Sequence, residues 1–147
     1  MRKIPLLLVL VAVSLVAGTA SAGELCVPTA EDARIASAVV QEVKARYARS
    51  PYGAQRTLRA GMRPRCRGDL AIHIYGVTSP EELGAVEMLA RESQSSVPKA
   101  GSVTLRFFER EVWIRTEGGG GYRGKEKLVR TVTVQSPRRE GAPKREG

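Results

Sequence analysis

The most distinctive chemical feature of this chain is a run of arginines that contains no acidic residue. Six arginines occur between positions 49 and 67, and the next acidic residue is Asp69. A guanidinium is planar and permanently charged and can donate to two oxygens at once, so the run favours contact with phosphate or carboxylate groups. A second basic stretch follows the glycines at 118–121. The anion-binding residues that we predict are Arg56, Arg59, Arg63, Arg65, Arg67, Arg123 and Lys125.

The charge of the whole chain agrees with an anionic partner. There are 24 Lys and Arg against 15 Asp and Glu, and the formal net charge is +9. Such a charge speeds encounters with anionic surfaces and makes binding sensitive to salt. The partners that we expect are lipid head groups or polysaccharides of a bacterial envelope, or another exported protein. Nucleic acid is disfavoured, because Tyr52 is the only aromatic residue in the Arg-rich segment and unpaired bases need stacking partners. The plain alternative is that the arginines only keep the protein soluble.

Residues suited to catalysis or metal binding are few. His73 is the only histidine, and the sequence lacks a GxSxG turn, an HExxH helix and a Cys/His cluster. Gly119 to Lys125 fits the spacing of a phosphate-binding GxxxxGK loop, but Glu126 replaces the Ser or Thr that would hold magnesium. We therefore expect a protein that is not an enzyme, with no catalytic site, no metal and no cofactor. The role predicted for His73 is a supporting hydrogen bond.

The two cysteines, Cys26 and Cys66, predict one disulfide. An even pair in an exported protein is most simply oxidised. Closing a loop of about 40 residues would stabilise the fold by about 4 kcal/mol, less any strain, if the effect is mainly one of chain entropy. Because Cys26 precedes the first expected helix and Cys66 precedes the first expected strand, the bridge would clamp the start of one to the start of the other.

The N-terminus has the pattern of a secretory signal peptide. Arg2 and Lys3 precede an apolar run from Ile4 to Val16, and the small residues Ala20 and Ala22 suit a signal peptidase. We expect residues 1–22 to be removed and the mature protein to be periplasmic or secreted. No second apolar run follows, so we expect no transmembrane span in the mature chain.

Helical periodicity occurs twice. Between 30 and 48, the residues Ile35, Val39 and Val43 recur every four positions, which predicts an amphipathic helix that ends before Ser50. The sequence Ser79-Pro80-Glu81-Glu82 has the pattern of a capping box with Pro at the first helical position. It predicts a second helix, which should end before the polar stretch at 93–98.

Alternating apolar residues predict strands at 69–76, 103–107, 112–115 and 128–134. The two strands that flank the second helix can be parallel, and the last two should form an antiparallel hairpin around the glycines. The apolar phase changes between 103–107 and 112–115, so we expect a bulge or bend near 108–111. Most of the Arg-rich segment should be loop, apart from a short edge strand at 55–58.

These elements together predict an α+β fold with one disulfide. Two helices would pack on one face of a small three- to four-stranded sheet, in the order α-β-α-β-β. Residues 23–135 would form a single domain. Residues 136–147 would form a disordered basic tail, because they offer almost nothing apolar to bury.

A second candidate surface is the sheet face that points away from the helices. If Ile72 faces the helices, His73 and Tyr75 project to the other side, and Trp113 and Arg115 would join them there. A mixed aromatic and basic face suits a protein partner or a dimer. An ordinary half-exposed sheet surface is the simpler explanation.

The order helix, strand, helix, strand over 30–112 resembles the bacterial envelope module called the BON domain. The residues that carry the resemblance are Gly76 after the first strand and Ser79-Pro80-Glu81-Glu82 at the start of the second helix. The resemblance implies attachment to membranes. The chain departs from that module in its Arg-rich insertion with Cys66 and in its extended C-terminal hairpin, so we do not assign membership.

Two functional hypotheses follow. The first is an exported, non-enzymatic binding module that contacts an anionic envelope partner through the Arg-rich segment. The second is a protein-protein interaction or inhibitor protein that uses the sheet face around Trp113 and Tyr75. Binding that weakens steeply with salt would favour the first, because contacts with a charged surface depend on ionic strength.

Overall fold

The computed structural model describes residues 26–125 and 127–137. The expected signal peptide and all but the first two residues of the expected tail lie outside this range. Among the described residues, no helix combines the length and the apolar character needed to cross a membrane.

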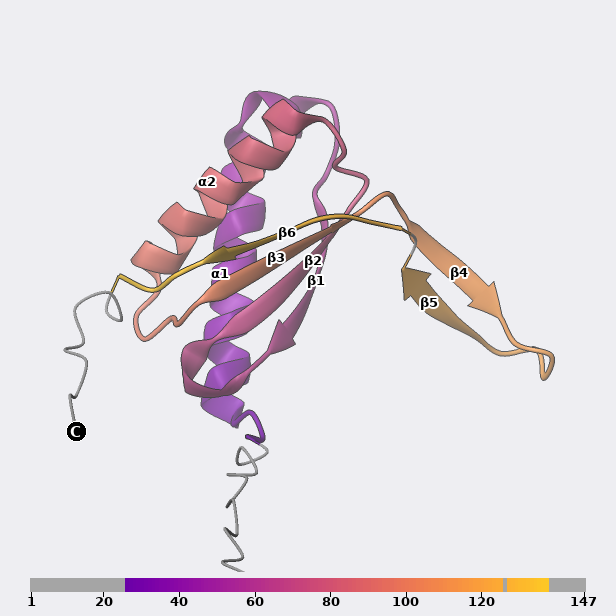
Figure 1. Ribbon diagram of the computed structural model, residues 1–147, viewed down its shortest axis with the longest axis horizontal. Coiled ribbons are helices and arrows are strands. Elements are labelled where there is room, and N and C mark those ends of the chain that lie inside the picture. The colour runs from indigo at the N-terminus through magenta and orange to yellow at the C-terminus, as the bar shows by residue number, and fades with distance from the viewer. Residues whose placement is uncertain (1–25, 126, 138–147) are drawn as a thin grey trace, which may run out of the picture.

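Two helices cover one face of a four-stranded sheet, and a separate two-stranded hairpin projects to one side (Figure 1). The predicted α+β fold with one disulfide is confirmed. The helices are α1 (Ala30–Arg49) and α2 (Pro80–Ser96). In spatial order the sheet strands are β1 (Arg59–Pro64), β2 (Leu70–Tyr75), β3 (Val103–Phe108) and β6 (Leu128–Val134). The hairpin contains β4 (Glu111–Arg115) and β5 (Gly121–Lys125), and short 3₁₀ helices occupy Pro51–Ala54 and Cys66–Gly68.

The main sheet is mixed. Its central strands β2 and β3 are parallel and are joined by α2, which is the arrangement expected for a strand-helix-strand crossover. The outer strands β1 and β6 each pair antiparallel with their neighbour. In this register Ile72 lies between Met62 on β1 and Leu105 on β3.

The hydrophobic core lies between the sheet and the two helices, and its positions are those that the apolar spacing predicts. The sheet contributes Leu70, Ile72, Ile74, Val103, Leu105 and Phe107, all almost completely buried. The helices contribute Ala36, Val39, Val40, Val43, Tyr47, Leu83, Val86 and Ala90. Each large apolar side chain that is removed from water contributes about 1.5–3 kcal/mol, so this layer holds the helices on the sheet.

The Arg-rich segment is more regular than predicted. An edge strand is present, but it spans Arg59–Pro64 and not 55–58. Gly61 and Pro64 argued for a loop, yet β1 is an edge strand, and an edge strand tolerates a Pro that lacks an N–H donor. The prediction that most of this segment is loop was wrong, and the correction places Arg59 and Arg63 on a sheet.

Helix α2 extends through Ser96, although it was expected to end before Ser93. The polar residues at its end are satisfied within the fold. The hydroxyl of Ser93 donates to the Leu89 carbonyl oxygen at 2.7 Å. The side-chain amide of Gln94 is buried and donates to the Gly101 carbonyl oxygen at 2.5 Å. Polar residues with such partners do not end a helix.

The C-terminal strands pair differently from the prediction. We expected 112–115 to pair with 128–134, but β6 pairs with β3, and β4 pairs with β5, a strand where only a basic loop was expected. The register shifts between Phe107 and Phe108, where the chain leaves the main sheet. The expected bend near 108–111 is therefore present. After it the chain forms the β4–β5 hairpin, and β6 then brings the chain back to the main sheet.

Candidate functional site

The sheet face that points away from the helices, called here the open face, carries side chains from three adjacent strands. Because successive residues of a strand point to opposite faces, the neighbours of the core residues define it. Cross-strand pairing sets Arg59 beside Tyr75, Gly61 beside His73, and His73 beside Arg106. The open-face residues of β1, β2 and β3 are Arg59, Gly61, Arg63, Ala71, His73, Tyr75, Thr104, Arg106 and Phe108.

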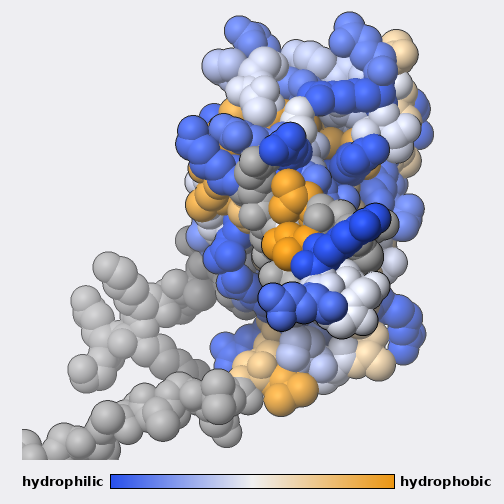
Figure 2. All heavy atoms as spheres, turned by 90° about the vertical axis from the view of Figure 1, so that its right-hand side faces the viewer, coloured by the Kyte–Doolittle hydropathy of each residue, from blue (hydrophilic) through white to orange (hydrophobic). Residues whose placement is uncertain are grey.

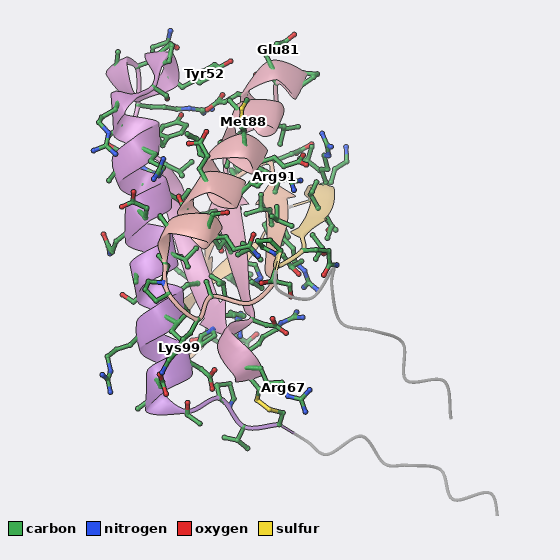
Figure 3. All side chains as sticks on the ribbon, turned by 90° about the vertical axis from the view of Figure 1, so that its left-hand side faces the viewer. Tyr52, Arg67, Glu81, Met88, Arg91 and Lys99 are labelled. Carbon is green, nitrogen blue, oxygen red and sulfur yellow. A yellow bond between two sulfur atoms is a disulfide. The ribbon has the colours of Figure 1, made fainter. Side chains whose placement is uncertain are left out.

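Charge is distributed unequally between the two sides of the molecule. The four strands of the main sheet contain no Asp or Glu, whereas β1 and β3 contribute Arg59, Arg63 and Arg106. The helical side presents both signs, as the outward Glu81 and Arg91 of α2 illustrate (Figure 3). On the side from which the hairpin projects, small hydrophobic areas are surrounded by hydrophilic side chains (Figure 2). The charge of the sheet strands is therefore purely cationic.

An open depression of about 550 Å³ lies on the open face, on the side of the sheet where β1 is the edge strand. We call it the arginine groove. Its small residues, Gly61 and Ala71, leave room between longer side chains. A Cβ added at Gly61 would meet only the Tyr75 hydroxyl, at 3.9 Å. The groove is lined by Gly61, Met62, Arg63, Pro64, Arg65, Ala71, His73 and Arg106.

The three arginines of the groove are not neutralised by the protein. Within the described residues, Arg63, Arg65 and Arg106 form no ion pair. Other cations do form such pairs, for example Arg46 with Glu42 and with Glu92. A cation held near a surface without a carboxylate partner attracts anions from solution more strongly than one already paired. Other described cations, such as Arg34 and Arg91, also form no ion pair, so the groove arginines are distinguished by lining one depression together.

Arg56, in contrast, is already engaged inside the protein. Its guanidinium pairs with the Glu82 carboxylate and donates to the Gly76 carbonyl oxygen at 2.6 Å. Its Nε also donates to the Tyr47 hydroxyl oxygen at 3.2 Å. Although Arg56 was predicted to bind anions, its donors hold the end of α1 to the start of α2.

The contacts among Arg56, Tyr47 and Glu82 shift the pKa values of Glu82 and Tyr47. Burial acts to raise the pKa of Glu82, but hydrogen bonds from Arg56 and Tyr47 outweigh it and hold that pKa below its usual value. Burial, reinforced by the hydrogen bond to Glu82, raises the pKa of Tyr47. The Glu82 carboxylate therefore stays ionised in the folded protein under neutral conditions.

The predicted disulfide joins Cys26 to Cys66, with their Cα atoms 6.1 Å apart. It clamps the start of α1 to the segment before β2, as expected, and a second link lies beside it. The Asp32 carboxylate accepts from the backbone N–H of Thr29 and of Gly68, each at 2.8 Å. These bonds lower the pKa of Asp32. Arg67 lies at this corner, next to the disulfide (Figure 3).

The residues predicted to form a partner-binding face are only partly brought together. His73 and Tyr75 share the open face, where both rings contact Phe108, with centroids 5.6 and 5.8 Å apart. Trp113 and Arg115 lie on β4, in the other sheet, where their backbones pair with Arg123 and Gly121. The predicted basic residues Arg123 and Lys125 lie on β5 of that hairpin and not on the main sheet.

Arg106 was not among the predicted site residues. The alternation of Leu105, Arg106 and Phe107 indicates that Arg106 points away from the core, and this signal was available in the sequence. Its position near Arg63 follows only from the strand order β1-β2-β3, which brings the two arginines to either side of β2.

No protein family, curated protein or solved structure matches this chain. The resemblance to the BON domain therefore has no support from these comparisons, and the function has to be argued from the site itself.

Proposed function

We propose that this protein is an exported, non-enzymatic binding module that holds an anionic component of the cell envelope, a lipid head group or a polysaccharide, in the arginine groove. The observation that carries the proposal is the set of three groove arginines that have no ion-pair partner within the described residues. The disulfide and the lack of a membrane-crossing helix among those residues are compatible with an exported protein that meets its ligand at a surface.

The binding strength in this proposal comes from several contacts acting together. An exposed ion pair contributes only about 0.2–1 kcal/mol by itself, because water and salt screen it. Three guanidinium groups around one depression act on the same anion, and their forked N–H groups match its oxygens. We therefore expect binding that is salt-dependent and that needs more than one of the arginines.

The test is a salt titration of oxidised residues 23–147 with anionic vesicles and with lipopolysaccharide. Three proteins are compared: the wild type, the groove variant Arg63→Gln/Arg106→Gln, and the control Arg34→Gln/Arg91→Gln. The control removes the same charge from exposed positions on the two helices, and Arg91 lies on the helical side (Figure 3). The groove variant should lose affinity and salt dependence, whereas the control should keep both. Equal behaviour of the two variants would contradict the proposal.

The second functional hypothesis, a protein-protein interaction, draws support from the projecting hairpin. Ile114 on β4 and Leu128 at the start of β6 are 39% and 50% exposed, so apolar surface is available to a partner there. A two-stranded hairpin by itself is only marginally stable in water, so a partner could stabilise it. Salt-tolerant 1:1 binding to another exported protein, lost in Trp113→Ala, would favour this hypothesis over the first.

A further inference from the structure

We propose that the arginine groove selects a phosphate monoester, that is, a terminal phosphate group, over a phosphate diester. This inference rests on the proposed function and narrows its ligand class. It follows from two features of the groove: the three arginines that line it, and the number of oxygens that they can serve.

The arginines converge from both sides of one strand. Arg63 belongs to β1 and Arg106 to β3, and β2 lies between them. Arg63 pairs with Ala71 and Arg106 pairs with His73, so the two arginines are offset by two residues along β2, which keeps them on the same face. Ala71 lines the same depression but is only 2% exposed, so the longer side chains around it cover it. Arg65 follows Arg63 by two positions and lines the same depression.

Three guanidinium groups offer more donors than a diester can use. Each guanidinium presents a fork that pairs with two oxygens. A phosphate monoester has three unsubstituted oxygens and a charge near −2 at neutral pH, whereas a diester has only two such oxygens and a single charge. A site lined by three such forks therefore gains more from the monoester, both in hydrogen bonds and in charge.

The first part of the experiment measures the ligand class in solution. Methyl phosphate and dimethyl phosphate are titrated separately into isotopically labelled residues 23–147, and the arginine Nε–H signals are followed by NMR. We expect methyl phosphate to bind at least about tenfold more tightly than dimethyl phosphate. In Arg106→Gln this preference should disappear, and in Arg91→Gln it should remain. Arg106→Lys keeps the charge but lacks the fork, so it should keep some affinity and lose most of the preference. Unchanged thermal unfolding of each variant confirms that it is folded.

The second part distinguishes the source of the phosphate and separates the inference from the proposed function. Vesicles with phosphatidic acid, a monoester, are compared with vesicles with phosphatidylglycerol, a diester, at matched surface potential. Preference for phosphatidic acid supports a lipid source, and a response to methyl phosphate without vesicle binding supports a soluble monoester. Equal, Arg63-dependent binding of both vesicles would overturn the inference but not the proposed function. A protein that binds neither vesicles, lipopolysaccharide nor methyl phosphate would overturn both.

Discussion

Glu82 accepts a hydrogen bond from the hydroxyl of Tyr47 at 2.6 Å, although the two residues are 35 positions apart. The sequence pattern had suggested that the Glu82 side chain would complete the capping box of α2. Only half of that box is present, because the Ser79 hydroxyl accepts from the Glu82 backbone N–H at 3.3 Å. The carboxylate instead turns to Tyr47 and Arg56 and ties the two helices together at one end of the molecule.

Glu82→Gln should destabilise the fold by about 1–3 kcal/mol near neutral pH, because Arg56 loses its charged acceptor while the site stays largely buried. The pH dependence has a definite sign. The folded pKa of Glu82 lies below the unfolded value, so its contribution is present above the unfolded pKa of about 4.5 and is lost as the pH falls through the folded pKa. Urea unfolding from about pH 3 to 7 should show this loss in the wild type and a flatter profile in the variant. The neighbouring exposed Glu81→Gln is the control, and an equally flat profile for it would contradict the assignment.

Arg56→Gln and Arg63→Gln should separate stability from binding. Arg56 donates to Glu82, Tyr47 and Gly76, so its loss should lower the free energy of unfolding by about 1–3 kcal/mol and leave vesicle binding nearly unchanged. Arg63 forms no ion pair within the described residues, so its loss should weaken binding and change stability by less than about 0.5 kcal/mol. Chemical denaturation and vesicle sedimentation on the same samples check both. Loss of binding in both variants would mean that the two arginines act in one site.

Removal of the disulfide should lower the free energy of unfolding by much of the stabilisation predicted for the bridge. Cys26→Ser/Cys66→Ser opens a loop that spans 40 positions, and we expect the free energy of unfolding to fall by about 2–4 kcal/mol. The neighbouring bonds from Thr29 and Gly68 to Asp32 should still hold the start of α1 in place, so the far-ultraviolet circular dichroism spectrum should keep its helical signal. Wild-type protein treated with a reductant should match the variant. A variant as stable as the oxidised wild type would show that the bridge does not constrain the unfolded chain.

Replacing Gly68 and Gly84 by Ala should change the stability of the fold in opposite directions. Gly68 has a φ of 73°, and a Cβ there would collide with the Lys99 carbonyl oxygen, so Gly68→Ala should destabilise by at least about 2 kcal/mol. Gly84 lies in the second turn of α2 with open space around it, so Gly84→Ala should stabilise by about 0.5–1 kcal/mol. Thermal unfolding of both variants measures the contrast. Destabilisation by Gly84→Ala would indicate a contact that α2 does not show here.

Helices and strands with strong local patterns were predictable from the sequence. Which strand pairs with which was harder to predict. The four-residue spacing of Val39 and Val43 and the Ser79-Pro80 cap define α1 and the start of α2 without any tertiary information. The pairing of β6 with β3 was not predictable in this way, since it depends on where the chain leaves the main sheet after Phe107. The strand β5 was missed because two of its five residues are glycines, which disfavour strands when judged alone.

The residues of the candidate site were also predictable from local patterns, whereas their arrangement in space was not. Arg63 and Arg65 were found from the charge run, and the alternation around Arg106 already indicated its face of the strand. The order of the strands joins them into one groove, and this order is set by contacts distant in the sequence. Arg56 belonged to the same charge run, but its acceptor Glu82 lies 26 positions away, so the run could not distinguish it from the groove arginines.

The position of β1 at the sheet edge has a consequence for self-association. Among the described residues no strand pairs with its outer side, so a row of backbone N–H and C=O groups is open to a strand from another molecule. Arg59, Arg63 and Pro64 lie on this strand, and charge and proline are features that keep exposed edges apart. An anion that neutralises Arg63 would weaken this protection. We therefore expect the ligand-loaded protein to aggregate more readily through β1 than the ligand-free protein does.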